Sequence, residues 1–401
     1  MKCGELMSLY ILMEKSSSYF FENRRKQEIA SIKSLNQKRI PTIVFENIED
    51  VPEIFTDSKA VLLVTNGLNE TNEHCIKVCN ENGIPIIFLH DKIKMHYKYI
   101  YSSITDNDDI TASMVYRYFK SNGKEKIAFF GFYANSKSDI SKVDAFYKVN
   151  LNFMNQDVFH IKSGFNECMN DFWEHRNEYD GVYFPNDFVA IAFLNYFRNK
   201  EPSYIEKRFF LGFSDTIVAR LFHTSVSSIS YTSEAVKSAV LQIYRCLTNN
   251  KNDFNCISID LKNILIPRDS TQKRALTNSD FVLTRIKRNV SMNFDGAEPY
   301  DHKSDPALKD IFVLENLLLN AKTMDMLIIY MFLKGYSNTT ITNKLFLTPQ
   351  SLNVHKKNYF QKTGCKDKSE FVKLLSKYIS LKHLEEYIQY VSKDITDFSN
   401  Y

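Results

Sequence analysis

The sequence between residues 334 and 364, KGYSNTTITNKLFLTPQSLNVHKKNYFQKTG, predicts two short helices joined by a tight turn. Gly335 is suited to end a preceding helix, because glycine readily adopts the left-handed conformation found at helix C-termini. Thr348 and Pro349 supply an N-cap followed by proline at the first helical position, so a second helix should begin there and run to about Thr363. A short helix, a tight turn and a polar, basic second helix are typical of a helix-turn-helix, a DNA-binding motif.

The residues on either side complete a small all-helical domain. An apolar stripe from Met326 to Leu333 indicates a helix before the turn, and Ser337 or Asn338 can cap the short helix that follows. The segment 369–378 predicts a last amphipathic helix. The core-facing side chains of the second helix of the motif are expected to be Leu352, Tyr359 and Phe360. On this pattern alone, a generic four-helix module that does not bind DNA remains an alternative.

The charge of this segment favours nucleic acid. Between residues 321 and 378, ten lysines accompany only Asp325, Asp367 and Glu370, a net charge of +7, whereas the whole chain of 401 residues carries +4. The rest of the chain is therefore mildly acidic. A small basic domain on a mildly acidic body is an electrostatic pattern of nucleic-acid binding, although a solvated lysine-rich surface would look the same.

The stretches KGYSN, LTPQSLNVH and KTGC within residues 334–365 resemble the LuxR-type DNA-binding domain, with its spacing kept without gaps. Three sites depart from the usual pattern: Thr340 replaces a glutamate, Thr342 replaces an alanine, and Ser351-Leu352 replace a threonine-valine pair. The resemblance implies that the helix 349–363 enters the major groove of double-stranded DNA. The residues that we expect at the DNA are Thr348, Gln350, Ser351, Asn353, Val354, His355, Lys357 and Lys362.

The residue types of this segment suggest a base preference. No arginine follows Arg288, so the bidentate contact of arginine with guanine is not available to the motif. Gln350 and Asn353 are suited to adenine, and the lysines are suited to phosphates. We therefore expect a site rich in A and T and a steep salt dependence. For His355, a polar surface or capping role is the alternative to DNA contact.

The first two thirds of the chain alternate short apolar runs with helical patterns. Such alternation predicts an α/β fold with doubly wound parallel sheets. The candidate strands are 9–13, 42–45, 60–64, 85–89, 126–131, 158–161, 181–184 and 209–212. The candidate helices are 20–38, 73–82, 108–122, 141–150, 168–178, 188–199 and 233–247. Eight strands divide into two groups of four, which suggests two lobes with a cleft between them.

Several stretches of this region resemble the sensor domain of the LacI family, a periplasmic-binding-protein-like fold. They are DN at 106–107, GKEKI at 123–127, DGVYFPNDFVA at 180–190, FLGFSD at 210–215, SISY at 228–231 and ILIPRDS at 264–270. The resemblance implies a sensor over residues 8–270. One lobe would comprise about 8–104 and 216–248, and the other about 105–215 and 249–270.

The resemblance also implies an effector site in the cleft, formed by Asp106, Lys142, Asn186, Asp187, Ser214 and Asp215. Two positions depart from the family. Lys142 replaces an arginine and loses its two-pronged grip on hydroxyls, and Ser214 replaces an aspartate. We expect a saccharide effector, with another metabolite or no ligand as alternatives. Asp187 is equally suited to cap a helix, and Asn186 and Asp215 are suited to turns.

Other classes of protein have little support in the sequence. The seven scattered cysteines indicate free thiols and a cytoplasmic protein, and no stretch approaches the roughly 20 apolar residues of a membrane span. There is no signal-peptide pattern, phosphate-binding glycine loop, dinucleotide-binding fingerprint, zinc-protease motif or nucleophile elbow. We expect no enzyme activity, no cofactor and no metal.

The combined prediction is a cytoplasmic, homodimeric transcriptional regulator. Its DNA-binding domain follows the sensor, whereas the LacI family, which the sensor resembles, has its helix-turn-helix at the N-terminus. The sensor spans 8–270, a linker 271–305, the LuxR-type domain 306–380 and a C-terminal tail 381–401, with one short helix suggested at 281–289. A regulator whose sensor binds a protein partner or nothing is the first alternative. A solute-binding protein that serves a transporter is the second; the basic C-terminal domain argues against it.

Overall fold

The computed structural model describes residues 7–13, 19–46, 60–65, 69–89, 99–248, 256–277 and 304–392. The chain divides into two compact units, Met1–Asn107 with Tyr231–Ile264, and Asp108–Ser230 with Leu265–Tyr401. Among the helices described, none has the length and apolar content needed to cross a membrane. Within the same residues, no group of three or more His, Cys, Asp or Glu side chains is placed to hold a metal ion.

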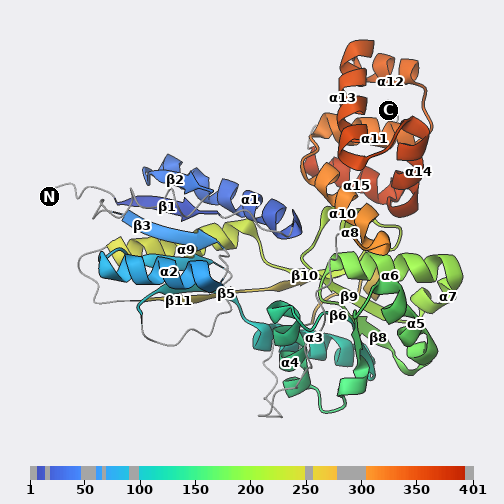
Figure 1. The fold of residues 1–401 in the computed structure, drawn as a ribbon. Coiled ribbons are helices and arrows are strands. Elements are labelled where there is room, and N and C mark those ends of the chain that lie inside the picture. Colours follow the sequence, from blue (N-terminus) through green and yellow to red (C-terminus); the bar gives the residue numbers. More distant parts are fainter. Residues whose placement is uncertain are drawn as a thin grey trace. The chain divides into compact units, whose positions relative to one another are not determined.

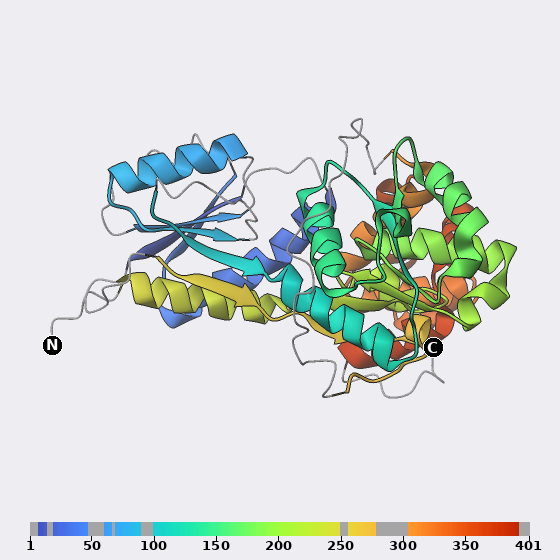
Figure 2. The same ribbon diagram turned by 90° about the horizontal axis from the view of Figure 1, so that it is seen from below.

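The first unit is a parallel sheet with helices on both faces. Its strands lie in the order β11-β5-β4-β3-β1-β2, and each neighbouring pair is parallel. The helices α1 (Tyr19–Lys33) and α9 (Ser233–Thr248) cover one face and α2 (Asn69–Glu81) covers the other (Figure 2). The strands are β1 (Ser8–Leu12), β2 (Thr42–Phe45), β3 (Ala60–Thr65), β4 (Ile86–Leu89), β5 (Ser102–Asp106) and β11 (Ser258–Leu261).

The second unit contains the other sheet, in the strand order β12-β10-β9-β8-β6-β7. Its strands are β6 (Ile127–Phe132), β7 (Val158–His160), β8 (Gly181–Tyr183), β9 (Phe209–Phe213), β10 (Ser227–Ser230) and β12 (Ile264–Ile266). The helices around it are α3 (Asp108–Ser121), α4 (Lys137–Val149), α5 (Phe165–His175), α6 (Asp187–Lys200), α7 (Pro202–Glu206) and α8 (Ile217–Leu221).

Alternating side chains of β6 fill the core on both faces of this sheet. Phe129 belongs to the cluster that packs against α3 and α4. Phe130 points to the opposite face, as successive residues of a strand do, and its ring lies 5.5 Å from that of Phe172 and 4.9 Å from that of Phe193. A strand that is buried on both faces explains why its sequence is almost continuously apolar.

The α/β prediction is confirmed, and all eight predicted strands are present within a few residues of their expected ends. Four strands, β5, β10, β11 and β12, were not predicted. Two of them correct the lobe boundaries. Residues 227–230 pair in parallel with β9, so they belong to the second unit and not to the first lobe. Residues 258–261 pair in parallel with β5, so they belong to the first unit and not to the second lobe.

The C-terminal module, residues 304–392, is all-helical, as predicted (Figure 1). Its helices are α10 (Pro306–Leu319), α11 (Thr323–Leu333), α12 (Asn338–Leu345), α13 (Pro349–Thr363), α14 (Lys368–Tyr378) and α15 (Leu381–Val391). The tail predicted from residue 381 thus begins with a helix. The predicted linker begins at Thr271, which is fully buried, and residues 278–303, with the suggested helix at 281–289, lie outside the described residues.

The C-terminal module belongs to the same compact unit as the second sheet. Its helix α10 packs against α6 and α8, and α15 packs against α8 and α11. An antiparallel bridge also joins Phe222, just after α8, to Ile379, just after α14. The sequence predicted a linker between sensor and DNA-binding domain, but it did not predict this packing.

Candidate nucleic-acid interface and effector site

The two helices of the motif begin and end at the predicted signals. Ser337 caps α12, because its Oγ accepts a hydrogen bond from the N–H of Thr340 at 3.0 Å. Thr348 caps α13, because its Oγ1 accepts from the N–H of Ser351 at 3.1 Å. The end of α13 is Gly364, with φ 74° and an N–H that donates to the carbonyl of Phe360 at 2.8 Å. These local contacts fix where the exposed face of α13 starts and stops.

One side of α13 packs into the module and the other is exposed. Leu352 and Tyr359 are buried, as predicted, and the ring of Phe360 lies 5.9 Å from that of Phe371. On the outer side, Val354 is 69% exposed although it is apolar. The turn before α13 carries Phe346, which is 95% exposed with φ 52°.

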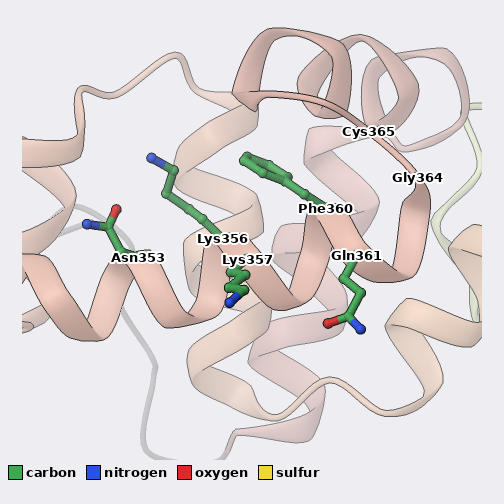
Figure 3. Close-up of a pocket in the computed structure, with 7 residues that line it drawn as sticks. All are labelled: Asn353, Lys356, Lys357, Phe360, Gln361, Gly364 and Cys365. Atoms are coloured by element: carbon green, nitrogen blue, oxygen red, sulfur yellow. The ribbon is translucent and has the colours of Figure 1, made fainter.

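The outer side of α13 borders an open hollow of about 740 Å³ (Figure 3). Its lining is basic and amide-rich, the chemistry that recognises phosphates and base edges. The lining residues are Asn353, Lys356, Lys357, Phe360, Gln361, Gly364 and Cys365. Asn353 and Lys357 were predicted to contact DNA. Lys356 and Gln361 were not, although their helical spacing from Asn353 and Lys357 places them on the same face.

The other predicted DNA residues also lie on α13 or at its start. Thr348, Gln350, Asn353, Val354 and Lys357 are exposed. Ser351 and Lys362 are partly exposed, as is His355. Seven of the eight predicted residues therefore lie on α13, and the eighth, Thr348, is its N-cap. A polar, lysine-containing side of this helix faces solvent.

His355 has a role inside the module. Its Nδ1 lies 2.7 Å from Oδ1 of Asp325 in α11, and the hydroxyl of Tyr359 donates to the same oxygen at 2.7 Å. Partial burial raises the pKa of Asp325, but hydrogen bonds from Tyr359, the N–H of Lys322 and His355 outweigh it and hold that pKa below its ordinary value. His355 thus anchors α13 to α11, and only its Nε2 remains for a contact with DNA.

Five of the six predicted effector residues gather where α4, β8 and β9 of the second unit meet. Asn186 and Asp187 follow β8, Ser214 and Asp215 follow β9, and Lys142 lies on α4. The carboxyl ends of parallel strands are where open α/β sheets bind ligands. The sixth residue, Asp106, ends β5 in the first unit and is partly buried.

Asp187 is fully buried and is bonded to the protein on both oxygens. Its Oδ2 accepts from the N–H of Thr216 at 2.7 Å, and its Oδ1 accepts from the hydroxyl of Ser228 at 2.7 Å. Burial raises its pKa to about 7. A Cβ at Gly212 would lie 2.3 Å from Oδ1 of Asp187, so only glycine leaves room for this carboxylate.

Asp215 is held by two arginines. Arg220 binds it through Nε at 3.1 Å and Nη2 at 2.6 Å, and Arg268 binds it through Nη2. The turn that carries it is strained, with φ 108° at Ser214 and 55° at Asp215. Backbone strain of this kind costs of order 1–3 kcal/mol per residue and concentrates at functional sites.

Lys142 and Asn186 also have partners inside the second unit. Nζ of Lys142 donates to the hydroxyl of Ser138 at 3.0 Å and to the carbonyl of Pro185 at 3.1 Å, and it lies 4.3 Å above the ring of Phe213. Asn186 caps α6 by accepting from the N–H of Val189 at 3.1 Å. The helix cap that was the alternative role for Asp187 is therefore supplied by its neighbour, Asn186.

Comparison with known proteins identifies the C-terminal motif. Residues 324–375 match the family model described as "GerE: Bacterial regulatory proteins, luxR family". This segment is a LuxR-type helix-turn-helix domain, and it includes α11 to α13 and most of α14. No relative with a curated function was found for the chain.

Solved structures resemble the rest of the chain in fold. A lac repressor dimer bound to operator and the anti-inducer ONPF gives a TM-score of 0.52 at 14% identity, covering 67% of this chain and 82% of that one. A transcriptional regulator CelR–cellobiose complex gives 0.51 at 12%, covering 66% and 84%. The Escherichia coli transcriptional repressor ascG gives 0.51 at 13%, covering 66% and 98%. The similarity confirms the predicted LacI-type fold for this part of the chain.

Proposed function

We propose that this chain, which joins a LuxR-type DNA-binding domain to a sensor of LacI-type fold, is a transcriptional regulator controlled by a small effector. The observation that carries the proposal is the exposed, lysine-containing face of α13, with its ends fixed by Thr348 and Gly364. In a helix-turn-helix the second helix of the motif enters the major groove and its N-terminal residues contact base edges.

The side chains on α13 fall into two groups, those suited to base edges and those suited to phosphates. Gln350 and Asn353 have side chains suited to adenine edges, and Val354, which is 69% exposed, would supply an apolar surface for thymine methyl groups. Lys356, Lys357 and Lys362 supply charge for phosphates. This set favours A·T pairs, since the chain has no arginine after Arg288 to bind guanine.

Selection of binding sequences from a random DNA pool tests this preference. We expect an A/T-rich consensus, with a half-site repeat that reflects a homodimer. Replacement of Asn353 by alanine should relax the preference at one position, at a cost of about 1–3 kcal/mol for the correct base. A G/C-rich consensus, or no enrichment with the full chain, would contradict the proposal.

For the sensor we propose a saccharide effector. Support comes from the polar carboxyl edge of the second sheet and from the similar folds, one solved with cellobiose and one with ONPF. One observation favours the alternative, a sensor that does not bind a saccharide: Asp187 and Asp215 are already bonded to other residues of the chain. A sensor that binds a protein partner remains the second candidate.

Thermal unfolding with a panel of saccharides distinguishes the two candidates. A ligand present at 100 times its Kd stabilises the folded chain by about 2.7 kcal/mol, so we expect the Tm to rise by several degrees with the right saccharide. A matched panel of amino acids and nucleotides is the control. No shift with any small molecule would favour the protein-partner alternative.

The remaining assignments follow from the DNA-binding role. We propose a cytoplasmic homodimer that requires no cofactor, with two C-terminal modules on two half-sites of double-stranded DNA. We assign it no catalytic activity, as expected from its likeness to regulators. A solute-binding role is not favoured, because such a protein has no need of a LuxR-type domain.

A further inference from the structure

The short helix α8 is held by carboxylates from both parts of the second unit. From the sensor side, Oδ2 of Asp187 accepts the N–H of Thr216, the N-cap residue, at 2.7 Å. From the C-terminal module, Glu315 of α10 accepts the N–H of Ile217 on Oε1 at 3.1 Å and the N–H of Val218 on Oε2 at 2.8 Å. Glu315 is nearly fully buried, and burial raises its pKa to about 7.

The other end of α8 is bonded to α15 and the residues before it. The N–H of Ser380 donates to the carbonyl of Leu221 at 2.8 Å. His383 of α15 lies with Nδ1 2.7 Å from the carbonyl of Phe222 and with Nε2 2.9 Å from Oδ2 of Asp269. The hydrogen bond to Asp269 raises the pKa of His383, which favours its charged form in this contact.

Two further contacts extend the junction to the helices beside α8. Asp305, the N-cap of α10, accepts the N–H of Phe165 of α5 at 2.8 Å. The rings of Phe188 in α6 and Phe312 in α10 lie 4.4 Å apart. The junction therefore combines buried polar contacts with apolar packing, which resembles a domain interior more than a flexible tether.

This docking leaves the DNA face open. Asn353, Val354 and Lys357 are exposed within the second unit, although α10 and α15 are packed on the sensor part. The sensor part of the second unit thus does not cover the helix that would contact DNA. The contacts therefore do not support a control mechanism in which this part blocks α13.

We propose that α8 transmits the state of the strained turn Ser214–Asp215 to the DNA-binding module, and that Glu315 is the positioning residue that couples them. This inference rests on the proposed function. The turn runs directly into α8 through Thr216. Because both ends of this five-residue helix are bonded to the module, a ligand that moves the turn must move the module or break those contacts. Packed junctions respond to such shifts by switching between discrete arrangements.

A double-mutant cycle on the full chain tests the coupling without an identified effector. Ser214→Gly changes the turn by removing the strain that a positive φ places on a residue with a side chain. Glu315→Gln weakens the hydrogen bonds that residue 315 accepts from α8, while the side chain keeps nearly the same size and shape. We expect Ser214→Gly to change the Kd for a selected DNA site by about fivefold or more, and to change it far less in the Glu315→Gln background. Asp310→Asn, a partly exposed carboxylate of the same helix that pairs with Lys377 of the module, is the matched control and should preserve the effect.

Hydrogen exchange on the same proteins gives a readout that does not depend on DNA. Glu315→Gln should speed exchange in α8, α10 and α15 and leave α13 unchanged, while Asp310→Asn changes none of them. Equal effects of Ser214→Gly in both backgrounds, or no effect with Glu315 present, would overturn the inference. Failure of the unaltered chain to bind any DNA would instead refute the proposed function.

Discussion

Asp187→Ala is expected to lower the free energy of unfolding by about 3–5 kcal/mol in the absence of any ligand. The change removes a fully buried carboxylate whose two oxygens bind the N–H of Thr216 and the hydroxyl of Ser228. Both groups would stay buried without a partner, and each buried donor left unsatisfied costs about 1–3 kcal/mol. Urea unfolding of the full chain, followed by circular dichroism, measures the loss as a lower midpoint.

The neighbouring residue is the matched control. Asn186 was predicted as an effector residue on the same grounds, but it is only partly buried and caps α6. Asn186→Ala should cost about 1 kcal/mol, the usual value of a lost helix cap. If Asp187→Ala left stability unchanged and reduced only the binding of a saccharide, then the effector role implied by the family resemblance would be correct and the structural role wrong.

Lys357→Ala is expected to weaken binding to every DNA sequence alike, by about tenfold at low salt. Lys357 is exposed on α13 beside the hollow in Figure 3, and a lysine there supplies charge to a phosphate without selecting a base. The slope of log K against log salt should become shallower by about 0.9, the change for one lost phosphate contact. Fluorescence anisotropy at several salt concentrations measures both quantities.

Lys382→Ala provides the comparison for this charge change. Lys382 lies on α15 and its side chain is 72% exposed. Its replacement by alanine removes the same charge as Lys357→Ala does, but from a different helix. Binding and salt slope should stay nearly as in the unaltered chain. A loss confined to one sequence for Lys357→Ala, or an equal loss for Lys382→Ala, would contradict the assignment of α13 as the helix at the DNA.

The helix-turn-helix could be predicted from the sequence because its signals are local. Ser337, Thr348 and Gly364 act within three or four residues of themselves, and each caps the helix end expected of it. The apolar strands were predicted for a similar reason. By contrast, β10 reads SSIS and β11 reads SIDL. Such polar strands are defined by the neighbour they pair with, which no local pattern reveals.

The sites were harder to predict because their contacts join distant residues. Asp215 is bound by Arg220, five positions away, and also by Arg268, 53 positions away, and this second partner cannot be inferred from the surrounding sequence. Glu315 reads as an exposed residue of an amphipathic helix, since glutamate is seldom buried unless paired. Its partners are backbone N–H groups of α8, a helix too short to predict. The packing of the C-terminal module on α6 and α8 was missed for this reason.

The buried junction around α8 also bears on how such a protein can arise and be exchanged. Recombination at residue 305 would transfer the DNA-binding helices without the backbone groups that Glu315 and His383 contact, so both side chains would lose these partners in the recipient. The donor would expose the apolar surfaces that α10 and α15 now cover. We therefore expect that a transplant of the LuxR-type domain keeps its packing only if α8 is carried with it.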